Sequence, residues 1–166
     1  VGFRLGFVVI QTAGDISNFF SNIWPMSFFS FEDLRLFFSL VLIAISCIIM
    51  GAGIPTTATY IILVAVAAPA LAQLGIEPLV AHFFVFYYGV LADITPPVAL
   101  AAYAASGIAK SNPFKTGNTA FRLGIAKALV PFVFVYSPSL LLITGEFQTD
   151  QLLITLAGTL IGIALI

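Results

Sequence analysis

Long apolar runs separated by short breaks dominate the chain, and they predict helices of membrane-spanning length. Between Leu36 and Ile76 there is no charged residue. A membrane helix needs about 20 mostly apolar residues, so this run is too long for a single span. Two glycines and a proline interrupt it, and we therefore expect two helices at about 34–50 and 57–74 around a break at Gly51–Thr57.

Further segments follow this broken pair along the chain. We expect them at about 79–109, 110–127, 128–143 and 152–166. The first is a discontinuous helix that is interrupted near Asp93–Pro97, the second is polar, and the last two are apolar. Before the pair, Val1–Ile10 resembles the tail of a span, and Asn18–Phe31 is typical of an interfacial stretch with Trp24 as a membrane-belt residue.

The two ends of the sequence favour a part of a longer protein. The first residue is Val1, and the last expected span is cut inside its apolar run. We therefore expect residues 1–166 to be a fragment of one transmembrane domain, with about five to six membrane segments.

Composition agrees with a membrane-embedded chain and favours a function other than catalysis. Hydrophobic residues make up 61% of the chain and charged residues only 8%, against about 25% in a typical soluble domain. The net charge of -1 offers nucleic acid no basic surface. One histidine and one cysteine cannot form a usual metal site, and no phosphate loop or dinucleotide fingerprint occurs. Neither Asp15 nor Asp93 has the Gly-x-Gly-Asp context that an intramembrane aspartyl protease would need.

The basic residues indicate the orientation in the membrane. Four of the six share one stretch, at Lys110, Lys115, Arg122 and Lys127. By the positive-inside rule this stretch is cytoplasmic, and the loop with Glu146 and Asp150 then faces outside. Apolar residues lie among the cations, which favours a short amphipathic surface helix. An ordinary connecting loop is the alternative.

The first break is a candidate functional element. Non-helical backbone at membrane depth is tolerated only where protein or a water-filled cavity satisfies it. Gly51 can end the first helix as the left-handed C′ glycine, Gly53 and Pro55 continue the interruption, and Thr56 or Thr57 can cap the second helix. This geometry aims carbonyls from one helix and N–H groups from the next at one point, which suits Na⁺ and an anion. A tight surface turn between two full spans is the alternative.

The second break has a different chemistry. Pro96 and Pro97 remove two backbone donors and free carbonyls upstream, and Thr95 adds a hydroxyl. We expect Pro97 in the first turn of a helix over Ala99–Ala109. Discontinuous helices are the best sequence pointer to the binding site of a transporter, whereas a simple proline kink is the alternative.

Two titratable residues belong to this segment. Asp93 is expected in or near the membrane, where a carboxylate can coordinate a cation, carry a proton, or only cap the broken helix. His82 is expected near the outer end of the same helix, which favours an interfacial polar role over a proton relay.

Several motifs, in this order and spacing, resemble the large membrane subunit of tripartite ATP-independent periplasmic (TRAP) transporters. The motifs are Met50–Tyr60, Ala81–Tyr88, Asp93–Leu100, Asn112–Thr116 and Pro131–Val135. The resemblance covers about residues 36–143, and it is greatest to the fused-permease group that works with TAXI-type binding proteins.

The resemblance implies an importer of the bacterial or archaeal cytoplasmic membrane that is driven by a Na⁺ gradient and needs no other cofactor. A soluble binding protein would deliver an organic acid, and a small four-helix membrane subunit would be a separate or fused partner. The implied fold is all-α and polytopic, with two inverted repeats. Each repeat has a re-entrant hairpin and a discontinuous helix, and this chain would be the second repeat.

The match also implies a site at the two breaks. The candidate residues for Na⁺ or substrate are Gly51, Gly53, Pro55, Thr56, Thr57, Asp93, Thr95, Pro96 and Pro97. Two other functions remain open from the residues alone: an ion channel or passive pore built from the same broken helices, and a membrane scaffold that transports nothing.

Overall fold

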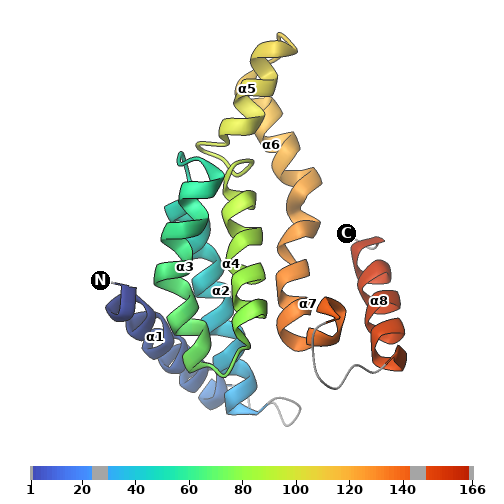
Figure 1. Cartoon of the computed structure of the whole chain (residues 1–166). Coiled ribbons are helices and arrows are strands. Elements are labelled where there is room, and N and C mark those ends of the chain that lie inside the picture. Colours follow the sequence, from blue (N-terminus) through green and yellow to red (C-terminus); the bar gives the residue numbers. More distant parts are fainter. Residues whose placement is uncertain (1, 24–29, 143–148, 165–166) are drawn as a thin grey trace.

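The computed structural model describes residues 2–23, 30–142 and 149–164, and every regular element within these ranges is a helix (Figure 1). The elements are α1 (Gly2–Ile23), α2 (Phe31–Gly51), α3 (Thr56–Gln73), α4 (Pro78–Ala92), α5 (Leu100–Ile108), α6 (Pro113–Gly124), η1 (Ile125–Ala128), α7 (Val130–Tyr136), η2 (Pro138–Leu141) and α8 (Thr149–Ala164). The expected all-α membrane class is confirmed.

The hairpin of α2 and α3 matches the expected broken pair. A capping box begins α2: the Asp33 N–H donates to Ser30 Oγ at 3.1 Å, and the Ser30 N–H donates to the Asp33 carboxylate at 3.1 Å. At 1.5 Å per residue the helices are about 31 and 27 Å long. Both are long and apolar enough to cross a membrane, as is the helical run Pro113–Tyr136.

The core lies where α4 packs against this hairpin. Leu40 from α2, Leu63 and Leu71 from α3, and Phe84 and Val85 from α4 are fully buried. Exposed large apolar side chains such as Ile49 and Ile61 occupy the outer faces of the same helices. Apolar residues both inside and outside are expected of helices that pack against each other within lipid.

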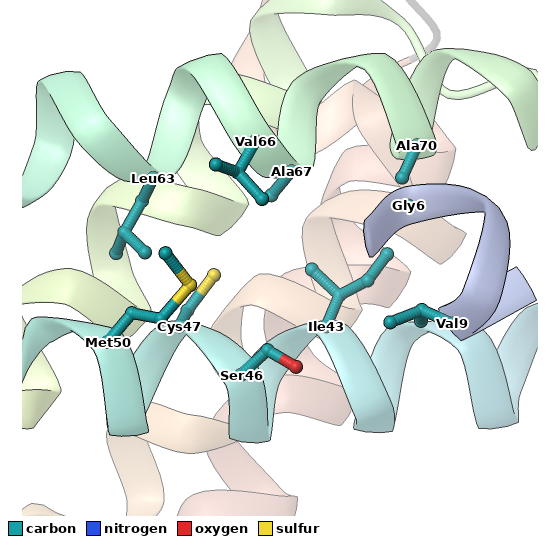
Figure 2. A pocket seen from close by; sticks show the side chains of 10 residues that line it. All are labelled: Gly6, Val9, Ile43, Ser46, Cys47, Met50, Leu63, Val66, Ala67 and Ala70. Atoms are coloured by element: carbon teal, nitrogen blue, oxygen red, sulfur yellow. The ribbon is translucent and has the colours of Figure 1, made fainter. Parts of the chain in front are cut away.

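A small apolar cavity marks the place where α1 reaches the hairpin (Figure 2). Its volume is about 30 Å³, which is close to the share of one water molecule in the liquid. Its hydroxyl-bearing residue, Ser46, donates to the Leu42 carbonyl at 2.8 Å. This cavity is therefore a packing gap, too small to hold a substrate.

One continuous helix, α1, covers most of the N-terminal region. It runs through Gly2–Ile23, so the expected span tail over Val1–Ile10 and the first residues of the expected interfacial stretch, from Asn18, lie in the same helix. Ser17 is fully buried, and its hydroxyl donates to the Phe31 carbonyl at the start of α2 at 3.3 Å. Trp24 lies outside the described residues.

The helices α5 and α6 form a hairpin, called here the arm, that projects beyond the bundle (Figure 1). Asn112 caps α6 by accepting the Lys115 N–H at 3.0 Å. The stretch at 110–127, expected as a short amphipathic helix or a connecting loop, contains the helix α6, which continues through the 3₁₀ turn η1 into α7. The expected span at 128–143 is shorter than predicted, since α7 ends at Tyr136.

Glycine permits a close contact of α2 with α4 at Gly51, and this contact generates a first prediction. A Cβ atom on Gly51 would lie 2.9 Å from Ala92 Cβ and 3.0 Å from Thr59 Cγ2. Gly51→Ala should therefore destabilise the protein by about 1–3 kcal/mol through overpacking. The measurement is thermal unfolding of the purified full-length transporter in detergent.

Gly14→Ala is the matched control, because a Cβ at Gly14 on α1 would meet nothing within 4 Å. Removing a glycine from an open helix position should raise stability by up to about 1 kcal/mol. Equal melting temperatures for the two variants would contradict the packing described for α2 and α4.

Candidate functional site

The two breaks predicted from the sequence lie against each other at the end of the bundle from which the arm projects (Figure 1). At the first break, Gly51 contacts Ala92 at the end of α4. A Cβ on Gly53 would lie 3.5 Å from Val98 Cγ1 in the second break. The contacts therefore bring residues 51–57 and 93–99 into one site.

Backbone geometry explains the first break. Gly53 has φ +85, a left-handed conformation that glycine adopts without steric cost. The Ile54 N–H donates to the Gly51 carbonyl at 3.3 Å. Thr59, which the sequence reading missed, closes the turn from α3 by donating its hydroxyl to the Ile54 carbonyl at 3.0 Å.

Two details of the first break correct the prediction. The left-handed residue is Gly53, whereas Gly51 is the last residue of α2. The N-cap of α3 is Pro55, without a side-chain cap, so neither Thr56 nor Thr57 fills that position. Both threonines lie in the first turn of α3 with exposed side chains.

The first turn of α3 presents free donors beside these hydroxyls. Its first helical hydrogen bond runs from the Thr59 N–H to the Pro55 carbonyl at 2.9 Å. The N–H groups of Thr56, Thr57 and Ala58 precede this bond, so they have no acceptor within the helix. A helix N-terminus of this kind favours an anion.

The second break separates α4 from α5 over seven residues, Asp93–Ala99. The Thr95 hydroxyl donates to the Leu91 carbonyl at 2.7 Å. Ala99 has φ 38 and precedes the first residue of α5, Leu100. Pro97 therefore lies before the helix, and its predicted place in the first turn is wrong.

Some carbonyls of the second break are paired and others are open. The Asp93 carbonyl accepts from the Ala101 N–H, and the Thr95 carbonyl accepts from the Ala99 N–H, each at 3.1 Å. Within the described residues, the carbonyls of Ile94 and Pro96 accept no hydrogen bond. Open carbonyls of an unwound helix are typical Na⁺ ligands in transporters.

Asp93 is half-buried at the start of this break. Its carboxylate has no hydrogen bond or ion pair in the described part of the chain. Asp15 belongs to α1, whose neighbours are α2 and α3, and is exposed. The described residues contain no group of three His, Cys, Asp or Glu side chains that could hold a metal ion.

His82 lies near the start of α4 and is half-buried. Its Nδ1 atom lies 2.7 Å from the Tyr60 hydroxyl, so the pair joins α4 to α3. The ring of Tyr60 also packs against Phe86, with centroids 5.9 Å apart. His82 is thus an interhelical partner within the bundle.

A third irregular segment lies beside the second break, and the sequence reading missed it. A Cβ on Gly124 would overlap Ile94 Cδ1, so the start of η1 packs directly on the break. The Tyr88 hydroxyl donates to the Ala128 carbonyl at 2.6 Å and thereby holds η1 on α4. A glycine ending an amphipathic helix was the only sequence signal for this contact.

Comparison with known proteins gives the family. Residues 3–149 match the family model for the DctM component of the tripartite ATP-independent periplasmic transporter. No curated protein and no solved structure matches the chain. The match covers most of the chain and includes both breaks and the arm. The chain therefore belongs to the DctM family, the large membrane permease component of TRAP secondary transporters.

Proposed function

We propose that this permease imports organic acids by coupling their movement to Na⁺, and that the two packed breaks hold the acid and the ion. The observation that carries the proposal is the contact of Gly51 and Gly53 with Ala92 and Val98. It gathers open carbonyls, hydroxyls and a helix N-terminus at one place in a chain with few charges.

The second break supplies the chemistry for a cation. The open carbonyls of Ile94 and Pro96, the Thr95 hydroxyl and the Asp93 carboxylate are all oxygen donors, which suit a hard cation. Because Asp93 has no positive partner within the described residues, a bound Na⁺ would neutralise its charge.

The first break supplies the chemistry for an anion. The unpaired N–H groups at the start of α3 lie at the positive end of the helix dipole. The exposed hydroxyls of Thr56 and Thr57 can donate hydrogen bonds to a carboxylate, and the Thr57 oxygen can at the same time be a ligand of a Na⁺ ion held by the second break. Gly51, Gly53 and Pro55 shape the turn, and the two glycines add no side chain to it.

The finer architecture belongs to the same proposal. The charge-free tip of α2 and α3, packed on a broken helix, favours a re-entrant hairpin in the second of two inverted repeats. The basic residues of the arm favour a position of the arm on the cytoplasmic side. The membrane is the cytoplasmic membrane of a bacterium or an archaeon in this proposal. The expected partners are an extracytoplasmic binding protein, of the TAXI type, and a small four-helix membrane subunit, separate or fused.

Uptake into proteoliposomes that contain the full-length transporter tests this function. With an inward Na⁺ gradient and the cognate binding protein, a radiolabelled mono-, di- or tricarboxylate should accumulate. Omitting either one should abolish accumulation. Flux that ignores both would favour a passive pore, and no flux from a folded preparation would favour a scaffold.

Two threonines test the proposed ion site. Thr95→Ala and Thr57→Ala should each raise the Na⁺ concentration for half-maximal uptake by roughly three- to tenfold, the loss expected for one oxygen ligand worth about 1 kcal/mol. The measurement is uptake as a function of Na⁺ at saturating substrate.

Thr119→Ala is the matched control for Thr95. The Thr119 hydroxyl donates to the Lys115 carbonyl at 2.9 Å, in the same i−4 pattern, but it lies on the arm. Its removal should leave the Na⁺ dependence unchanged. If all three variants behave like the unmodified transporter, neither Thr57 nor Thr95 belongs to the ion site.

A further inference from the structure

A pocket separate from the contact of the two breaks lies between α4 and η1. Its volume is about 100 Å³, and it is lined by Phe86, Tyr87, Val90, Leu91, Ile94 and Lys127. Lys127 is the one cation among otherwise apolar and aromatic side chains. Ile94 is shared with the second break, so the pocket adjoins the proposed ion site.

The charge of Lys127 has no counterpart within the described residues. Its ammonium makes no ion pair or hydrogen bond there. From Pro78 to Leu142 the only acidic residue is Asp93, and it forms no ion pair with Lys127. A cation beside an apolar surface at the membrane is satisfied by an anion or by water, and the exposed side chain of Lys127 is open to both.

Tyr87 gives the pocket a second polar group. Its ring packs edge-on against Phe134, with centroids 5.5 Å apart, and against Phe86 at 6.4 Å. These ring contacts hold the phenol in place. Within the described residues its hydroxyl has no hydrogen-bond partner, although a phenol can both donate and accept. An ammonium and a phenol in an apolar pocket are both potential donors to an oxyanion.

The position of η1 makes the pocket a fixed feature. Gly124 packs on Ile94 at one end of η1, and the Tyr88 hydroxyl holds the Ala128 carbonyl at the other. Lys127 lies between these two attachments. A volume of about 100 Å³ is roughly three times the share of one liquid water molecule, which suits one carboxylate or phosphate group and not a large acid.

We propose that Lys127, with Tyr87, forms an anion-binding pocket that takes a carboxylate or phosphate group beside the second break. Two sources can supply this chemistry: the transported acid near the cytoplasmic end of its path, or the headgroup of an anionic lipid. Binding of the transported acid rests on the proposed function. Binding of a lipid headgroup, and the anion-binding pocket itself, do not depend on it.

Protection of a cysteine in the pocket tests the proposal without requiring transport. Val90→Cys is introduced into the full-length transporter in phosphatidylcholine vesicles, and its alkylation rate by a neutral maleimide is measured. Cys47, the only cysteine of this chain, is buried, and the transporter without Val90→Cys gives the background rate. Succinate is the free-acid probe, and vesicles containing phosphatidylglycerol provide the lipid probe.

Succinate or phosphatidylglycerol should slow alkylation, and the one that does so identifies the source. Lys127→Met keeps the apolar stem and removes the charge, so it should weaken protection by about tenfold or more. Lys127→Arg should retain most of it, and Tyr87→Phe should weaken it by about threefold. Lys115→Met, a lysine of the arm outside this pocket, should leave protection unchanged.

Two results would overturn the proposal. One is an alkylation rate that neither succinate nor phosphatidylglycerol changes, in a preparation whose Tm matches that of the unmodified transporter. The other is protection that survives in Lys127→Met. The assay uses no Na⁺ gradient and no binding protein, so protection can be observed even where carboxylate uptake fails. The anion-binding pocket and the Na⁺-coupled import can therefore be refuted independently of each other.

Discussion

Backbone groups within a bilayer have no water to bond, so any irregular segment there depends on partners from the protein. The two breaks of this chain meet that requirement by packing together. Gly51 lets α2 approach the end of α4 without a side chain between them, and the Thr59 hydroxyl closes the turn above. The paired groups fix the shape, and the groups left open, at Ile94 and Pro96, are the ones available to an ion.

The segment η1 extends this arrangement to a third element. Since α6, η1 and α7 form one helical run, the arm is joined directly to the segment that packs on the second break. A shift of the arm would therefore be transmitted to Ile94 through Gly124, and to α4 through Tyr88. In this account the cation site, the anion-favouring turn and the pocket of Lys127 are neighbours at one end of the bundle.

The sequence predicted the helices whose signals are local and missed the features that depend on tertiary contacts. The hairpin of α2 and α3 followed from a charge-free run interrupted by glycine and proline, and the end of α4 followed from the proline pair. The start of α5 did not, because Ala99 adopts a left-handed conformation that alanine rarely takes. The pocket of Lys127 and the Tyr60–His82 pair were beyond prediction, since their members are far apart in the sequence.

If the two packed breaks form one ion-responsive site, Na⁺ should order both of them together. Hydrogen–deuterium exchange of the full-length transporter, compared in Na⁺ and in choline at equal ionic strength, measures this ordering. We expect Na⁺ to slow exchange in peptides covering residues 51–59 and 93–101 together, with the same midpoint concentration, while peptides of the arm at 113–124 do not change. A single shared site would be ruled out if Na⁺ slowed exchange in only one break or in neither break. It would also be ruled out if the two breaks responded with different midpoint concentrations of Na⁺.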